Sequence, residues 1–380
     1  KVNMQLLSLK NKFKKTYIGL GYHNTVTPSV ILRNILENPG WYTAYTPYQP
    51  EVSQGRLEML MNFQQMIIDL TGLDIANASL LDESTAAAEA MMMAYKIKKN
   101  KQQTFCIQNS CHPQTLSVLR TRAHPLGITI IEGKPNEDTF GCLIQNPDTY
   151  GEIEDLYTLI KSNKSKEIIS IVAADIMSMV VMKSPGSYDA DIVIGSSQRF
   201  GVPMGLGGPH AAFFATKDEF KRLMPGRLIG VSVDRNNKRS YRMALQTREQ
   251  HIRREKATSN ICTAQALLAI IAAAYAIYHG PKRLINIAST VNHNTRYLKK
   301  SLEKLEYKIK SNKYFDTIVI EDAKARDWFN KSVKEGINFR LINNTTFSIT
   351  IDETTTLEDI DNLIAFFNTT NKKIDANEIE

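Results

Sequence analysis

Apolar positions along the chain fall into two patterns, one typical of helices and one typical of buried strands. From Leu57 they recur at helical spacing as far as Gly72, and an Ala- and Met-rich stretch from Thr85 to Lys96 predicts a second helix. We predict strands at the short, continuously apolar runs that follow, at residues 105–107, 128–131, 142–144, 168–173, 191–194 and 211–214. Apolar strands that alternate with helices indicate an α/β fold with a mostly parallel sheet, covered on both faces.

The hydrophobic pattern changes at Gly280-Pro281, a pair that commonly ends helices. The preceding residues, 261–280, contain no charged side chain and are long enough to cross a bilayer. Their many small residues, together with Thr263, Gln265 and His279, favour a buried, Ala-rich helix that links two domains. We therefore predict no membrane span.

A smaller α/β domain is predicted after this helix, with a charged helix at 299–310 and strands at 317–320 and 346–351. An amphipathic helix is expected from Leu357, with a capping box in Thr355-Thr356-Leu357-Glu358. The N-terminal residues are rich in Pro, Gly, Tyr and Asn, which is typical of an irregular arm. The predicted division is an arm at 1–56, a large domain at 57–281, a small domain at 282–370 and a frayed tail at 371–380.

The net charge of +8 is concentrated in one segment. Residues 217–256 contain 12 Lys or Arg and five Asp or Glu, a balance of +7, and the rest of the chain is nearly neutral. A basic segment can bind nucleic acid, phosphate groups or an acidic protein, and the plain alternative is a solvated face. Because no zinc-finger spacing, helix-turn-helix signature or aromatic RNA-binding motif accompanies it, we predict no nucleic-acid partner.

The cysteines are too few for a disulfide framework in a chain of this length. Cys106 and Cys111 are five residues apart, and no second pair stands at metal-ligand spacing; Cys142 and Cys262 are isolated. We predict no metal site, and four reduced thiols in a cytosolic or matrix-like compartment.

Polar residues follow three of the predicted strands, where ligands bind in open α/β sheets. His112 comes after the strand at 105–107, Asp175 after that at 168–173, and Ser196-Ser197-Gln198-Arg199 after that at 191–194. A pyridoxal phosphate site needs a ring to stack on the cofactor, a carboxylate for its pyridine nitrogen, and a Lys for the Schiff base. His112 and Asp175 could supply the first two. The expected Lys is missing, and Arg199 cannot replace it because a guanidinium stays protonated.

Each of these residues also has an ordinary structural interpretation. A His at a strand end is commonly a hydrogen-bonding residue, and an Asp there is commonly a helix cap. A different Schiff-base lysine, such as Lys183, is a third possibility, but its position before Pro185-Gly186 and ahead of the strand at 191–194 argues against it.

The chain resembles the P-protein family of glycine decarboxylases, in its lysine-free N-terminal half. Asn38-Pro39-Gly40-Trp41-Tyr42 and Gly207-Gly208-Pro209-His210 are among the motifs that carry the resemblance. The matching strings lie at residues 21–25, 31–34, 37–42, 45–51, 53–56, 76–83, 85–90, 200–203, 207–214 and 248–262. The chain departs from the family's usual residues at His23, Ser84 and Leu206.

The resemblance implies the fold of pyridoxal phosphate-dependent transferases (fold type I) and a specific division of labour. Pyridoxal phosphate is carried by a lysine-bearing half, which decarboxylates glycine and passes the aminomethyl group to the lipoyl arm of the H-protein. In this half the resemblance implies a vestigial cofactor site at Thr85, His112, Asp175 and Gln198. It also implies that Asn24, Tyr45 and Tyr48 complete the partner's catalytic site, and we expect Arg253 and Arg254 to help bind the H-protein.

Two interpretations of the function follow. The chain is either a half of glycine dehydrogenase (decarboxylating), inactive alone, or a non-catalytic scaffold that binds the H-protein or the lysine-bearing half. A lysine-bearing sequence that continues from this chain, or is encoded beside it, would favour the first. We expect the bacterial cytoplasm, or the mitochondrial matrix in a eukaryote.

Overall fold

The computed structural model describes residues 2–43, 47, 49–245, 250–259, 265–369 and 372. The chain divides into two compact units. The large unit is formed by residues 23–149 and 153–288, and the small unit by residues 1–22, 150–152 and 289–380. The N-terminal residues are thus shared between the units, with 1–22 in the small unit and 23–56 in the large one.

The large unit contains a seven-stranded sheet in the order β2-β8-β7-β6-β5-β3-β4. Neighbouring strands pair in parallel from β7 to β4, whereas β8 is antiparallel to both β7 and β2. The strands are β2 (Ile75–Ala76), β3 (Thr104–Ile107), β4 (Thr129–Glu132), β5 (Thr139–Asn146), β6 (Ile169–Ala174), β7 (Ile192–Ser196) and β8 (Ala212–Thr216). The prediction of a mostly parallel sheet is confirmed, and a strand is present at each of the six predicted runs.

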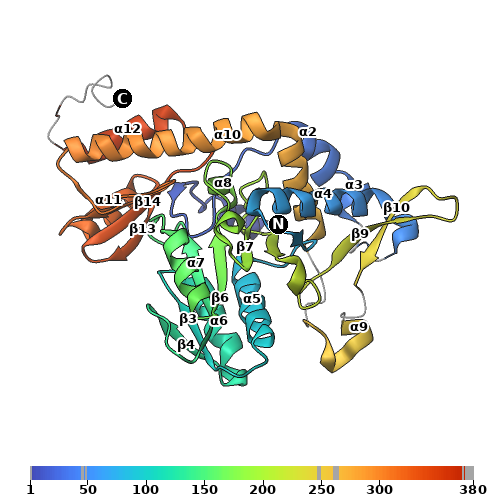
Figure 1. The fold of residues 1–380 in the computed structure, drawn as a ribbon. Coiled ribbons are helices and arrows are strands. Elements are labelled where there is room, and N and C mark those ends of the chain that lie inside the picture. Colours follow the sequence, from blue (N-terminus) through green and yellow to red (C-terminus); the bar gives the residue numbers. More distant parts are fainter. Residues whose placement is uncertain are drawn as a thin grey trace. The chain divides into compact units, whose positions relative to one another are not determined.

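Helices cover this sheet, which explains why its strands are apolar throughout (Figure 1). The helices are α4 (Gln54–Thr71), α5 (Glu83–Ile97), α6 (Pro113–Ala123) and α7 (Leu156–Ser165). Helix α5 packs on β5, β6, β7 and β8, and α7 packs on β6. Side chains of one face, including Phe105, Leu143 and Ile171, join the α5 and α6 side chains in the main core. Helix α4 ends at Gly72, which has the left-handed φ of 70° that favours glycine.

The small unit contains a five-stranded sheet in the order β1-β13-β14-β12-β11. Its strands are β1 (Lys15–Tyr17), β11 (Lys308–Ile309), β12 (Thr317–Glu321), β13 (Ile337–Asn343) and β14 (Thr346–Thr350), and its helices are α11 (Ala325–Lys334) and α12 (Leu357–Phe367). The stacked rings of Phe339, Phe347 and Phe367 lie in its core. The N-terminal strand β1 pairs in parallel with β13, so residues far apart in sequence share this sheet.

Helix α10 (Ala266–Lys304) bends at Gly280, where φ is 63° and ψ is 173°, in agreement with the predicted stop at Gly280-Pro281 (Figure 1).

Two other predictions about helices, the helix at 299–310 and the position of a capping box, differ from the structure. The helix predicted at 299–310 is wrong as a separate element, because α10 extends to Lys304 and Lys308–Ile309 is strand β11. The capping box is one residue later than predicted, with Thr356 and Asp359 making the reciprocal bonds. Within the described residues no helix has the length and apolar character of a membrane span.

The remaining elements are short, apart from a hairpin formed by β9 (Leu228–Val233) and β10 (Arg239–Ala244), which the apolar pattern did not indicate. The described residues of the N-terminal region form short helices joined by irregular segments. The short elements are α1 (Val2–Ser8), α2 (Ser29–Ile31), the π-helical turn η1 (Leu32–Leu36), α3 (Pro39–Tyr42), η2 (Pro50–Val52), η3 (His124–Leu126), α8 (Ile176–Met179), η4 (Pro185–Tyr188), η5 (Asp218–Phe220), α9 (Gln250–Arg253) and η7 (Arg254–Lys256).

Candidate functional site

The carboxyl ends of the parallel strands bring several polar side chains to one edge of the large unit's sheet. His112 follows β3, Asp175 follows β6, and Ser197, Gln198 and Arg199 follow β7. Asp175, His112 and Arg199 are close enough to influence the titration of one buried side chain, His23. The structure therefore groups the residues that the sequence singled out at strand ends.

Asp175 is already engaged by protein groups on both carboxylate oxygens. It caps helix α8, with Oδ1 accepting a hydrogen bond from the backbone N–H of Ser178 at 2.7 Å. The Arg199 guanidinium donates from Nη1 to Oδ2 at 3.1 Å, and this Arg side chain is only 5% exposed. The predicted cofactor carboxylate thus makes both the ordinary cap and an ion pair with the buried Arg199 side chain.

Gln198 is directed into the protein. Its side chain is fully buried, and Nε2 donates to the backbone carbonyls of His23 and Val202, both at 2.7 Å. Its Oε1 accepts from the backbone N–H of His23 at 3.1 Å. The amide therefore pairs with both backbone groups of one residue in the N-terminal region, much as a neighbouring strand would.

The other two residues of the predicted vestigial site lie at helix starts. His112 precedes α6, and its Nδ1 is 3.1 Å from the Thr149 hydroxyl oxygen. Thr85 is in the first turn of α5, where its backbone N–H donates to the Asp82 carboxylate at 2.7 Å. The His112 ring therefore bonds to a residue distant in sequence and does not cap α6, and the α5 cap is Asp82, with Thr85 contributing only its backbone N–H.

The sequence analysis gave no site role to three titratable residues near this edge. Burial, and next the Arg199 charge, hold the pKa of His23 well below its ordinary value. Burial also lowers the pKa of His210, whose Nδ1 is 2.5 Å from the Ser196 hydroxyl oxygen. Burial is the main cause that raises the pKa of the Glu83 carboxyl to about 7, with Asp175 adding to the rise. Only their nearness in space reveals them, because they come from three separate segments.

The remaining predicted residues are dispersed or cannot be placed. Asn24 lies in the segment beside Gln198, whereas Tyr45 and Tyr48 are outside the described residues. Arg253 ends α9 and Arg254 begins η7, and both are exposed. Lys183 is also exposed, with its ammonium group 4.6 Å from the centroid of the Tyr188 ring.

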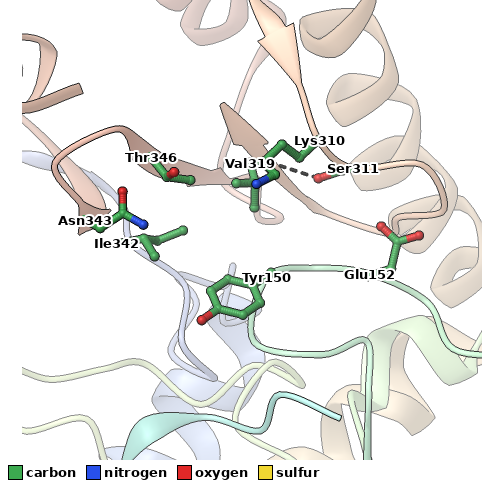
Figure 2. A pocket seen from close by; sticks show the side chains of 8 residues that line it. All are labelled: Tyr150, Glu152, Lys310, Ser311, Val319, Ile342, Asn343 and Thr346. Atoms are coloured by element: carbon green, nitrogen blue, oxygen red, sulfur yellow. Dashed lines mark hydrogen bonds between the residues drawn. The ribbon is translucent and has the colours of Figure 1, made fainter. Parts of the chain in front are cut away.

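A cavity of about 300 Å³ is lined by residues of the small unit. Figure 2 shows Tyr150 and Glu152 on one segment, with side chains of the β11–β14 region across from them. The Glu152 carboxylate accepts the backbone N–H groups of Asn312 and Lys313 at 3.2 and 3.0 Å. The Glu152 carboxylate thus has a structural role in holding residues 312 and 313.

In the part of the chain that the structure describes, no group of three or more His, Cys, Asp or Glu side chains is arranged to hold a metal ion. Cys106, Cys111 and Cys142 are buried free thiols, and Cys262 lies outside the described residues.

Sequence comparison matches the profile described as "Glycine cleavage system P-protein" to residues 1–367. The chain is 54% identical over 367 residues to a glycine dehydrogenase (decarboxylating) of Pelagibacter ubique (strain HTCC1062), across 95% of this chain and 39% of the relative. It is 53% identical over 371 residues to a protein of the same name from Nostoc sp. (strain PCC 7120), across 96% of this chain and 38% of the relative. The chain therefore spans less than half the length of these curated relatives.

Structural comparison agrees with the sequence match to the P-protein family. A crystal structure of glycine decarboxylase (P-protein) of the glycine cleavage system, in inhibitor-bound form, superposes with a TM-score of 0.89 and 31% identity, across 96% of this chain and 87% of that one. The apo cysteine desulfurase from Thermococcus onnurineus NA1 has a TM-score of 0.66 and 15% identity, across 93% of both chains. At that identity the second likeness concerns the fold alone, which is that of pyridoxal phosphate-dependent enzymes of fold type I.

Proposed function

Because the chain belongs to the glycine cleavage system P-protein family, we propose that it is the lysine-free half of a glycine decarboxylase. The observation that carries this proposal is Gln198, a fully buried amide at the strand-end position where a Schiff-base lysine is expected. An amide cannot form an imine with an aldehyde cofactor, so the reaction needs a lysine from another half. The family match over residues 1–367 supports the identity of that reaction.

The residues at this sheet edge do not fit pyridoxal phosphate. The Asp175 carboxylate faces Arg199, so the position that a pyridinium nitrogen needs is taken by a guanidinium of the protein itself. We therefore propose that the lysine-bearing half carries the cofactor, which would supply the electron sink for the decarboxylation of glycine. No step of the reaction is assigned to a cofactor in this half.

This half contributes binding surfaces in the proposed assembly. In this proposal Asn24, Tyr45 and Tyr48 complete the partner's site and orient glycine or its leaving carboxylate. Arg253 and Arg254, both exposed, belong to the basic segment that attracts the lipoylated H-protein, which accepts the aminomethyl group.

Borohydride reduction tests the absence of a Schiff base in this half. We expect peptide mass mapping of the purified chain, reduced in the presence of pyridoxal phosphate, to find no stoichiometric pyridoxyl-lysine. In a mixture with the lysine-bearing half, the label should appear on that half alone, and glycine-dependent release of carbon dioxide should need both halves. A stoichiometric adduct on any lysine of this chain, Lys183 included, would sink the proposal.

A non-catalytic scaffold remains the second candidate, because both the Gln198 amide and the Asp175–Arg199 pair are consistent with a site that has no chemistry. It differs in one expected outcome. A pure scaffold could be altered at Asn24, Tyr45 or Tyr48 without loss of turnover, provided that the two halves still assemble.

A further inference from the structure

The turn after β7, residues 197–202, bonds to a segment that lies much earlier in the chain, residues 23–27. The Gln198 side chain binds the backbone N–H and carbonyl of His23. The Thr25 hydroxyl donates to the Arg199 carbonyl at 3.0 Å and accepts from the backbone N–H of Gly201 at 3.2 Å. Two residues further on, the Thr27 hydroxyl donates to the Gly201 carbonyl at 2.8 Å.

This turn is itself held rigidly. Gly201 has a left-handed φ of 74°, and a Cβ there would lie 2.5 Å from the ring of Tyr275, so only glycine fits. Phe200 is fully buried and stacks on Tyr275. The Arg199 guanidinium is tied to Asp175, at the end of the neighbouring strand. The turn therefore offers fixed hydrogen-bonding groups to the segment that it contacts.

We infer that this turn is a clamp that holds residues 23–27, with Gln198 as its central positioning residue. The strand-end position that would carry a Schiff-base lysine is thereby used to fix Asn24, which stands between the anchored residues His23 and Thr25. The clamp rests on the contacts above, whereas a role of Asn24 in the partner's catalytic site rests on the proposed function.

Burial makes these bonds consequential. Gln198 is fully buried and His23 is 7% exposed, so the backbone groups of His23 have little access to replacement water. A side chain of equal size without hydrogen-bonding groups would leave those backbone groups unpaired, and the segment should open locally more often. The parallel strands behind the turn keep their own ladder and should be unaffected.

Hydrogen–deuterium exchange tests the clamp in the purified chain. In Gln198→Met, the peptide covering residues 20–28 should exchange faster by roughly tenfold or more, while peptides from β6 and β7 keep their wild-type rates. Ser197→Ala is the matched control. It removes a buried hydrogen bond of 2.6 Å that the Ser197 hydroxyl donates to the Ala211 carbonyl, and this bond does not involve residues 23–27. The control should leave the exchange of residues 20–28 within a factor of two of wild type.

An unchanged rate at residues 20–28 in Gln198→Met, or an equal acceleration in Ser197→Ala, would overturn the clamp. Should Gln198→Met not fold, Thr25→Val removes the bonds to Arg199 and Gly201 from a half-buried position and is expected to give the same local acceleration.

Turnover of the assembled enzyme separates the clamp from the proposed function. With the lysine-bearing half present, Gln198→Met should lower kcat by roughly tenfold, with normal pyridoxal phosphate content, and Ser197→Ala should not. Faster exchange of residues 20–28 with a wild-type kcat would support the clamp. It would also show that this segment has no role in the partner's site.

Discussion

Adjacent residues after β7 point to different partners, and this decides what the site can do. The Gln198 side chain pairs with the backbone of His23, while the Arg199 side chain pairs with Asp175. The Arg199 side chain is buried whereas the Asp175 side chain is partly exposed, so separating the pair would leave the guanidinium buried without its counterion, which is costly. A lysine at position 198 alone would therefore meet neither the space nor the free carboxylate that a cofactor needs.

Glu83 is expected to make stability depend on pH. Its Oε1 is buried, and burial raises the pKa of the Glu83 carboxyl from 4.5 to about 7. Between those pH values the folded state holds a proton that the unfolded state has lost, so stability falls as pH rises from about 4.5 to 7. The loss is at most about 3 kcal/mol, and Glu83→Gln should abolish it.

Urea unfolding at pH 5 and pH 8 measures this effect. The difference between the two free energies of unfolding should shrink in Glu83→Gln and persist in Glu58→Gln, a control at an exposed position of α4. The same pH dependence in Glu83→Gln and wild type would show that Glu83 is not its source.

The tyrosines of the proposed catalytic segment are tested by removing their hydroxyl groups alone. If Tyr45 or Tyr48 touches glycine in the partner's site, Tyr→Phe should slow decarboxylation by the assembled enzyme by about 100-fold. A Tyr that only packs should lose about 1 kcal/mol of stability and keep its turnover. Turnover within a factor of two for both variants would make this segment structural.

At the scale of elements, the sequence was most informative where burial is complete. Runs such as Ile171-Val172-Ala173 are covered on both faces, so their apolar character is continuous and predicts strands. The hairpin β9–β10 and strand β13 carry charged and half-exposed residues, among them Arg239 and Arg340, and therefore lack that signal. Helix 299–310 was misjudged because charge alone does not indicate where a helix ends and a short strand such as β11 begins.

The site was partly predictable for the same reason. Strand ends and order placed His112, Asp175 and the turn at Gln198 on one edge, because carboxyl ends of parallel strands meet there. The direction of a side chain is not encoded in that pattern. The Asp175–Arg199 pair, and the approach of His23 from a segment 175 residues away, depend on tertiary packing that no local spacing reveals.

The basic segment provides a prediction about association. Arg253 and Arg254 are exposed at the junction of α9 and η7. If they attract an acidic H-protein, Arg253→Glu/Arg254→Glu should slow association more than dissociation, by roughly tenfold at low salt. Added salt should weaken wild-type binding, because charges are screened beyond ~8 Å at physiological ionic strength. Stopped-flow kinetics measure both rates. An unchanged association rate would show that Arg253 and Arg254 are ordinary solvent-exposed charges without a role in binding.

At the scale of the whole molecule, the large apolar side chains of the N-terminal residues suggest a missing partner. Their exposed fractions reach 76% for Met4, 79% for Leu9 and 101% for Phe13, and helix α1 has no buried residue. Water contact on so many apolar groups is unfavourable, which fits a surface that another chain covers.

We expect a stable pair with the lysine-bearing half, burying more than the ~1,600 Å² of a standard interface. Sedimentation of the co-expressed halves should give one species at micromolar concentration. Removal of residues 1–13 should weaken the pair without unfolding the large unit, whose core lacks them. Two independently sedimenting halves would contradict the assembly.

The contact between Gln198 and His23 also implies an order in which parts of the chain can fold during synthesis. It joins residues 175 positions apart, and closing so long a loop is disfavoured until other structure brings its ends together. During synthesis, residues 23–27 leave the ribosome early but have no docking surface until β7 and its turn have been made and have joined the sheet. A nascent chain therefore carries its Asn24 segment unprotected until the turn at residue 198 has been made, and a chain truncated before that residue never secures it. Residues 23–27 are in this way secured only after the sheet that carries the turn has formed. Until then the segment is accessible to chaperones and proteases.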